Sequence, residues 1–385
     1  MSAAVDLLER ATQVARLKSM ISVAIAARAD DFDAAGELPA DVLSLCAQEG
    51  LFGMAIPTGH GGIGLDPREL GEVFESLGRA SASALSLATV HVMVCSALLR
   101  WGSAAQKQRW LPHLASGGAI GAFALSEAEA GSDANAVQTT LRSESDEIVV
   151  DGCKAWISFG TIAGLFLVVG KLDGRIAAIL VDRSTPGIDI EPIDGMAGFR
   201  AGMLAQVRFE GCRVPRENLL GSADFGLSQI VGSVLDHGRY SIAWGAVGLA
   251  QACLQASVDY AAKRRQFGRP LQEHQLVQQM LADMMVEHRA ARLMCLDAAA
   301  ARANRSPDMI VRTTAAKYVA ARAADRAAAA AMQIHGANGF STRYPVQRFQ
   351  RDARVFGVIE GTTQIQQVLL AQHAPQWADG LKEFF

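Results

Sequence analysis

The chain has 385 residues, of which 50% are hydrophobic and 19% charged, and its formal net charge is −3. This balance is typical of a folded globular protein and excludes a disordered or fibrous chain. No block of five or more basic residues occurs, so the charge pattern of a nucleic-acid-binding protein is missing.

The six cysteines lie far apart, without a CxxC motif or a nearby pair of histidines. This spacing favours reduced thiols in a cytoplasmic protein, and we expect neither a disulfide nor a metal site. The first twenty residues lack the basic start and the unbroken apolar stretch of a signal peptide, and they predict an amphipathic helix. The most alanine-rich part, 319–332, is interrupted by three charged residues, so we expect no membrane-spanning segment.

From the start to residue 118, apolar residues recur every three or four positions, as in 41–53 and 70–80, which predicts several short helices. From residue 119 to 222 the pattern changes to short runs rich in β-forming residues between Gly, Asp and Ser turns, which predicts a β-domain. These runs are AIGAFALSE, EIVVDGCKAWIS, LFLVVGKL, RIAAILVD and AQVRFEGCRVP.

Helical spacing returns in the last segment, 223–385, where we expect three long helices at 228–268, 276–303 and 313–336 and a shorter last one. Small residues fill these stretches, and alanine lets helices approach closely, so the segment predicts a helical bundle. The β-domain is then an insertion between two helical parts. The predicted fold class is α+β, mostly α.

Near the C-terminal end a single acid, Glu360, interrupts an apolar run and precedes Gly-Thr-Thr. Residues 363–366 fit a capping box, and an acid ahead of a helix gains roughly 0.3 to 1 kcal/mol from the helix dipole. The apolar residues ahead of the acid, within 355–359, and Gly361 after it also suit a cavity, where burial raises the pKa of a carboxylate and glycine lets a substrate come close. The local pattern leaves both interpretations open.

Four separated motifs together resemble the acyl-CoA dehydrogenase family along nearly the whole chain. They are FALSEAEAGSDA (123–134) with KAWIS (154–158), RRQFGRPLQEHQLVQQMLADM (264–284), QIHGANGFSTRYPVQRFQRDAR (333–354) and IEGTTQIQ. The resemblance implies an N-terminal helical domain (1–118), a middle β-barrel or sandwich domain (119–222) and a C-terminal four-helix bundle (223–385). It also implies FAD, bound non-covalently between the β-domain and the bundle with a neighbouring subunit contributing.

In this family the acid of the EGT motif removes the α-proton of an acyl thioester while the β-hydride passes to the flavin. The resemblance therefore implies that Glu360 is the catalytic base and that its backbone N–H holds the thioester carbonyl together with a flavin hydroxyl. A few relatives carry the base on a bundle helix, at a position that is Gly238 here. Because glycine has no carboxylate, Glu360 is the better candidate.

The resemblance also implies binding positions. Those matched to FAD contacts are Phe123, Leu125, Ser126, Trp156, Ser158, Arg264, Gln266, Phe267, Gln275, Gln333, Gly336, Thr362 and Gln364. Those matched to substrate contacts are Ser132, Asp236, Arg239 and Gly361. Structural alternatives remain for several: Trp156 as a core tryptophan, Arg264 as a solvated helix-end charge, and Asp236 with Arg239 as an ion pair one turn apart.

The chain departs from the usual family pattern in its first motif, where Ala128 and Glu129 replace a proline and a small residue, and at Ala337 and Ile359. The loop at 221–230 is shorter and less glycine-rich than usual, near the nucleotide end of CoA. The LDHGRYSIAWG and VIEG segments resemble the branch of polyketide and peptide antibiotic pathways, which acts on acyl groups tethered to carrier proteins. CoA and a carrier protein both remain open as the handle.

The implied partners are an acyl thioester, an electron-transfer flavoprotein as electron acceptor, and further copies of the chain in a dimer or tetramer. We expect no nucleic acid and no membrane. Two alternatives stay open. One is a flavin monooxygenase or oxidase of the same fold, and the other is a flavin-free scaffold protein without catalysis.

Overall fold

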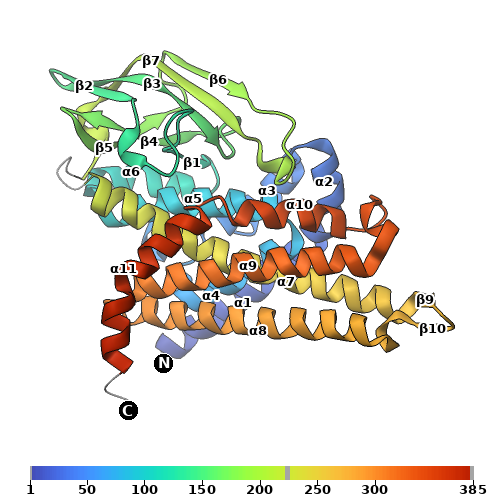
Figure 1. Cartoon of the computed structure of the whole chain (residues 1–385). Helices are drawn as coiled ribbons and strands as arrows, with labels where there is room; N and C mark the ends of the chain where they lie inside the picture. The colour runs from blue at the N-terminus through green and yellow to red at the C-terminus, as the bar shows by residue number, and fades with distance from the viewer. Residues whose placement is uncertain (1, 222–225, 382–385) are drawn as a thin grey trace. The chain divides into compact units, whose positions relative to one another are not determined.

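The computed structural model describes residues 2–221 and 226–381 of the chain (Figure 1). The predicted domain boundary at 222 and part of the loop at 221–230 lie outside these residues. The chain folds into two compact units. Unit 1 comprises Met1–Leu70, Ser86–Met196 and Arg200–Gly238, and unit 2 comprises Gly71–Leu85, Ala197–Phe199 and Arg239–Phe385.

The N-terminal part is helical, as its apolar spacing predicts. Its helices are α1 (Ser2–Met20), α2 (Ala29–Ala35), α3 (Ala40–Gln48), α4 (Pro67–Ala80), α5 (Ala82–Trp101) and α6 (Ala104–Ala115). The start of α6 is fixed by a capping box, in which Ser103 accepts from the Gln106 amide and the Gln106 side chain accepts from the Ser103 amide.

An eight-stranded sheet forms the middle part, with strand order β6-β7-β3-β2-β4-β5-β8 and β1 pairing with β4 in parallel. The strands are β1 (Gly121–Ala124), β2 (Thr140–Glu144), β3 (Glu147–Ile157), β4 (Leu165–Leu172), β5 (Arg175–Asp182), β6 (Ile188–Pro192), β7 (Ala205–Pro215) and β8 (Leu219–Leu220). All five predicted runs contain strands. The pattern missed β2, β6 and β8, which are short or carry many polar residues.

The sheet is buried on both faces around β4, which explains its unbroken apolar sequence. Leu165 and Leu167 belong to a core with residues of α5 and α6, such as Leu98 and Leu111. Phe166, the residue between them, faces a second core formed within the sheet. Successive residues of a strand point to opposite faces, so two cores share this strand.

In the described residues of the C-terminal part, the α-helices are α7 (Gly232–Lys263), α8 (Gln275–Ala303), α9 (Met309–His335), α10 (Val346–Phe356) and α11 (Thr363–Leu381). A two-stranded hairpin, β9 (Arg265–Gln266) with β10 (Arg269–Pro270), separates α7 from α8. In Figure 1, α9 lies beside α8 over most of its length. The prediction of one shorter last helix was wrong, because α10 precedes α11.

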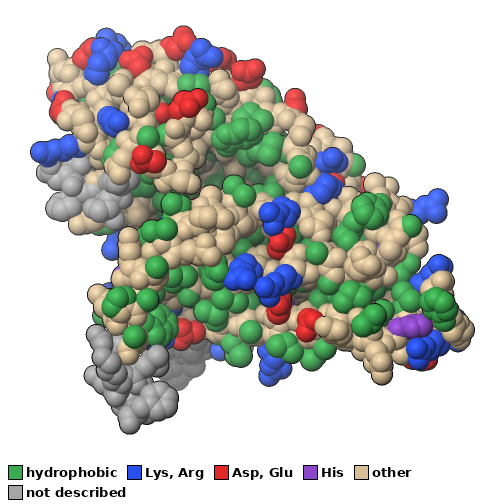
Figure 2. Space-filling model, viewed as in Figure 1, with side chains coloured by type: hydrophobic (Ala, Val, Ile, Leu, Met, Phe, Trp, Pro, Cys, Tyr) green, Lys and Arg blue, Asp and Glu red, His purple; other side chains and the backbone are tan. Residues whose placement is uncertain are grey.

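Apolar side chains lie exposed along α8, and hydrophobic atoms appear over the α8 region in Figure 2. They include Leu276, Met285, Val286 and Leu293. Exposed apolar surface of this kind on a folded unit suits contact with another chain.

Two helices in the described part of the chain are long and apolar enough to cross a membrane by length and composition. They are Ala82–Trp101 and Gln229–Lys263, and 89% and 72% of their most apolar windows are buried inside the protein. The expectation of no membrane-spanning segment stays a prediction, because this test rests on length and composition alone. Core helices of soluble proteins have the same composition and burial, so this finding is weak evidence for a membrane.

Candidate active site

The turn between α10 and α11 places Glu360 in an unusual backbone conformation. Its φ is +53°, and that of Gly361 is +89°. The left-handed region costs a residue with a side chain on the order of 1 to 3 kcal/mol and persists only where surrounding contacts determine it. The turn is closed by Thr363, whose amide (2.9 Å) and hydroxyl (3.2 Å) both donate to the Gly357 carbonyl.

Two buried cations hold the carbonyls of this turn. The Lys317 ammonium donates to the carbonyls of Ile359 and Gly361, each at 2.9 Å. Arg239 Nε donates to the carbonyl of Glu360 itself at 3.3 Å. Three consecutive carbonyls are thus bound by side chains of α7 and α9, which fixes the backbone of the turn.

The carboxyl group of Glu360 lies in a poorly solvated place. Its Oε2 atom is buried and has no hydrogen-bond partner among the described residues. Burial raises the pKa of Glu360 to about 7, against the opposing charges of Lys317 and Arg239. A pKa near neutrality combined with an unused buried oxygen is what a general base requires.

The start of α11 differs by one residue from the predicted capping box. Thr362, rather than Thr363, accepts from the Ile365 amide at 3.3 Å. The Gln366 side chain does not return to the cap amide but donates to the Gly361 carbonyl at 2.7 Å. The prediction was wrong because the Thr363 hydroxyl is used to close the turn at Gly357.

Gly361 is required by its backbone conformation rather than by lack of space. A Cβ atom added there would meet the Arg239 guanidinium at 3.6 Å, which is an ordinary contact distance. The φ of +89° is the feature that an L-residue rarely adopts. Thr362 and Gln364, matched to FAD contacts, lie at the start of the same helix, and Gln364 is exposed.

In unit 1, residues matched to FAD contacts meet at one place on the sheet. Leu125 and Ser126 follow β1, and Trp156 and Ser158 lie at the end of β3. The Ala155 amide donates to the Ser126 carbonyl at 2.9 Å and joins the two segments. Phe123 lies partly buried on β1 itself, whereas Ser132 is exposed on the loop that follows.

Trp156 is 56% exposed and has a φ of +63°, so the interpretation as a core tryptophan is wrong. An exposed aromatic ring at the edge of a buried sheet is available for stacking on another planar group. The conformation at this residue turns the chain out of the regular strand.

A buried ion pair, which the sequence patterns did not reveal, supports this edge of the sheet. Lys154 Nζ contacts the Glu127 carboxylate at 2.7 Å and donates to the Leu125 carbonyl at 2.9 Å. Glu127 also accepts from the amides of Gln138 (2.6 Å) and Thr139 (3.0 Å). These bonds explain why the pKa of Glu127 stays low, at about 2, despite burial.

A second group of matched residues lies at the hairpin end of unit 2, which extends past the helices in Figure 1. Arg264 and Gln275 border the hairpin and Gln266 lies in it, and all three are exposed. Phe267, at the hairpin turn, is 94% exposed with a φ of +48°. Such exposed donors and an exposed ring are suited to binding a molecule outside this unit.

The end of α9 is tied to α7 close to this hairpin. The rings of His335 and Tyr260 stack with centroids 4.2 Å apart, and the Tyr260 hydroxyl donates to the His335 carbonyl at 3.3 Å. Gln333 and Gly336 flank this contact and are exposed. No atom lies within 4 Å of a Cβ built on Gly336, so a ligand has room to approach.

The remaining matched residues, Asp236 and Arg239, lie one turn apart on α7. Both are buried, at 4% and 8% exposure. Arg239 is the one of the two that donates to the Glu360 carbonyl, at 3.3 Å.

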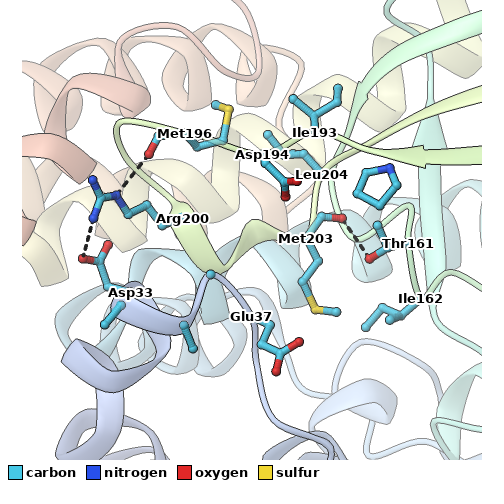
Figure 3. A pocket seen from close by; sticks show the side chains of 15 residues that line it. Asp33, Glu37, Thr161, Ile162, Ile193, Asp194, Met196, Arg200, Met203 and Leu204 are labelled. Carbon is cyan, nitrogen blue, oxygen red and sulfur yellow. Dashed lines mark hydrogen bonds and ion pairs between the residues drawn. The ribbon is translucent and has the colours of Figure 1, made fainter.

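A cavity of about 560 Å³ in unit 1 is lined by none of the predicted site residues (Figure 3). It lies between the end of α2, the segment after β3 and the segment between β6 and β7. Arg200 on its wall forms an ion pair with Asp33 at 4.0 Å, and the Thr161 hydroxyl donates to the Met203 carbonyl at 3.3 Å.

Three family models match the chain: acyl-CoA dehydrogenase N-terminal domain over 11–118, middle domain over 122–212 and C-terminal domain over 224–374. The chain belongs to the acyl-CoA dehydrogenase family. It is therefore a flavin-dependent oxidoreductase that acts on CH–CH groups, and FAD is its cofactor. The family supports dehydrogenation of an acyl thioester as the general reaction.

Individual relatives show how closely the family members agree. A probable acyl-CoA dehydrogenase of Bacillus subtilis is 40% identical over 364 residues, covering 92% of this chain and 95% of the relative. The structure of FkbI, described for biosynthesis of the methoxymalonyl extender unit of a polyketide, is 36% identical with a TM-score of 0.87, covering 94% of this chain and 99% of that one. The prolyl acyl carrier protein oxidase AnaB is 27% identical with a TM-score of 0.88, covering 94% and 98%.

Proposed function

We propose that the protein dehydrogenates an acyl thioester between its α- and β-carbons, with Glu360 as the base. The observation that supports this most strongly is the buried Oε2 atom without a partner, on a carboxyl group whose pKa is about 7. Such a carboxyl group is partly ionised at neutral pH, and its ionised form can accept a proton from the substrate.

In the proposed reaction the ionised Glu360 removes a proton from the α-carbon, and the electron pair left behind forms the new double bond. The bound FAD supplies the acceptor for the hydride that leaves the β-carbon. The backbone N–H of Glu360 donates to the thioester carbonyl, where negative charge develops. Arg239 and Lys317 place positive charge near the carboxylate and hold its turn rigid.

The residues of this chain fit FAD. We propose that the exposed ring of Trp156 and the polar groups of Ser126 and Ser158 contact the flavin ring, with Phe123 and Leu125 on the same strand. The guanidinium of Arg264 suits the pyrophosphate, because its planar fork donates to two oxygens at once. The other positions in this proposal are Gln266, Phe267, Gln275, Gln333, Gly336, Thr362 and Gln364.

The acyl group is carried on a phosphopantetheine arm, and we propose Ser132, Asp236, Arg239 and Gly361 as its contacts. Relatives named for acyl-CoA favour CoA as the handle, whereas AnaB is named for an acyl carrier protein. Anaerobic bleaching of the flavin distinguishes the two. Butyryl-, octanoyl- and palmitoyl-CoA are compared with the same acyl groups on a carrier protein, and bleaching by the carrier-bound forms alone excludes CoA.

We propose that the protein passes its electrons to an electron-transfer flavoprotein. We also propose that it is a cytoplasmic homo-oligomer, and that the domains of each copy span 1–118, 119–222 and 223–385. The exposed apolar side chains of α8 support contact between copies. The name of AnaB favours a second candidate function, an oxidase of the same fold that passes electrons to oxygen. Hydrogen peroxide formed in proportion to enoyl product assigns the oxidase, and its absence assigns the dehydrogenase.

The variant Glu360→Gln tests the proposed base. It keeps the shape of the side chain but cannot accept the proton, so we expect bound yellow FAD with flavin reduction slowed by about 10³-fold or more. Glu287→Gln is the matched control. Glu287 forms an ion pair with Arg326 at 2.6 Å and is not part of the 357–363 turn. Reduction of Glu360→Gln at the wild-type rate excludes Glu360 as the base.

A further inference from the structure

We propose that Lys317 is a positioning residue that sets both the direction of the Glu360 carboxylate and the direction of its backbone N–H. The inference rests on the proposed function, because it assigns to Lys317 the alignment of the base and of the carbonyl-binding amide. Lys317 does not touch the substrate in this proposal. It acts only through the backbone of the turn.

Lys317 lies in the third turn of α9, and its side chain is completely buried. Its two hydrogen bonds go to the carbonyls on either side of Glu360, and no carboxylate of the described chain lies within 4.0 Å of its ammonium. Among the described residues, the other fully buried lysine is Lys154, which has Glu127 as an ion-pair partner. A buried ammonium satisfied by backbone carbonyls alone is expensive to desolvate, so its position beside the turn calls for a reason.

The geometry of the peptide bond provides that reason. In a trans peptide the carbonyl of Ile359 and the N–H of Glu360 belong to one plane and point in opposite directions. Binding the Ile359 carbonyl to Lys317 therefore turns the Glu360 N–H away from the lysine. This N–H is the proposed donor to the thioester carbonyl.

The second bond of Lys317 fixes the other side of Glu360. The Gly361 carbonyl is held at 2.9 Å, and Arg239 holds the intervening carbonyl of Glu360. All three peptide planes around the base are thereby fixed, with φ of Glu360 at +53°. A residue in this region needs such support, because an unconstrained turn relaxes to a more favourable conformation and moves the carboxylate.

Lys317 also acts on the base through its charge. The charges acting on Glu360 are Lys317 from α9 and Arg239 from α7, and both lower its pKa against the effect of burial. Burial lowers the pKa of Lys317 itself to about 7, so its charge is fully present only on the acid side of neutrality. Removing that charge therefore raises the pKa of Glu360 on the acid limb. A residue that only fills space in the core has no such effect on the pH dependence.

The test compares Lys317→Met with wild type, as holoenzymes with equal FAD content, using the acyl thioester that bleaches wild type fastest. We expect the rate constant of flavin reduction to fall about 10- to 100-fold with less than about threefold change in substrate Kd. The acid limb of the rate against pH moves up by about one pH unit. Arg322→Met is the control, because Arg322 is exposed on the same helix and contacts Tyr318.

Hydrogen exchange gives a second result that needs no turnover. Backbone amides at 357–363 exchange faster in Lys317→Met than in wild type or Arg322→Met. If Lys317→Met does not fold, Lys317→Gln keeps a donor without the charge. Lys317→Gln should slow flavin reduction less than Lys317→Met does. Both variants should shift the acid limb of the pH–rate profile upward by the same amount.

The positioning role is overturned if a folded Lys317 variant shows the same rate of flavin reduction, the same pH profile and the same hydrogen exchange as wild type. The proposed function fails by a different result, which is rapid flavin reduction by Glu360→Gln. Slow reduction by Glu360→Gln together with unchanged Lys317 variants therefore rejects this inference alone.

Discussion

The raised pKa of Glu360 predicts a specific pH dependence of flavin reduction. The carboxylate is the active form, so the rate increases with pH as the proton leaves. With a pKa of about 7, about a tenth of the base is ionised at pH 6 and about nine-tenths at pH 8, a roughly tenfold change. A glutamate with an ordinary pKa near 4.5 is almost fully ionised throughout this interval and gives a flat profile.

The assay is anaerobic stopped-flow absorbance of the flavin at substrate concentrations well below saturation. Under this condition the second-order rate constant reports the ionisation of the free enzyme. Reduction by dithionite over the same pH range is the control for effects on the flavin itself. A rate constant that is flat or decreasing between pH 6 and pH 8 refutes the reasoning from burial.

Three further predictions concern the backbone and the buried charges. Burial lowers the pKa of His91 to about 4, so the unfolded chain takes up its proton first and stability decreases as pH falls from 6.5 to 4. This group contributes about 3 kcal/mol to that decrease. In denaturant unfolding, the free energy of unfolding of His91→Gln should therefore fall less between pH 7 and pH 4.5 than that of wild type. Gly361→Ala should lower the free energy of unfolding by about 1 to 2 kcal/mol and slow flavin reduction. Gly357→Ala is the control, because its φ of −74° suits alanine, and it should change neither quantity. Thermal melts measure the stability, and stopped-flow traces measure the reduction. Lys154→Met leaves Glu127 buried without its cation and should cost about 3 to 5 kcal/mol in denaturant unfolding, and equal stability of variant and wild type contradicts this.

Sequence patterns located the main strands because burial on both faces leaves a direct trace in composition. The run at 165–172 is apolar throughout, and the structure places its residues alternately in two cores. The helix α10 left a trace that was harder to interpret. Its buried residues, Val346, Phe349, Ala353 and Phe356, follow helical spacing, but charged side chains between them make the segment polar on average.

The site was predictable only in part. Glu360 stands out in the sequence as an isolated acid among apolar residues, yet its left-handed backbone conformation has no local signal, since glutamate rarely adopts it. Lys317 lies on the buried face of α9 with Ala320 and Ala324, so a lone lysine among alanines was the available clue. Its acceptors lie 42 and 44 residues further along the chain, and helical periodicity carries no information on such pairs.

The most direct test of the central claim follows the α-hydrogens themselves. An acyl thioester deuterated at the α-carbon is mixed with each holoenzyme in ordinary water, and the deuterium that remains is measured by mass spectrometry. Wild type should release one α-deuterium for every enoyl product formed, whereas Glu360→Gln should retain both over the same period. Release of α-deuterium by Glu360→Gln at the wild-type rate contradicts the assignment of Glu360 as the base.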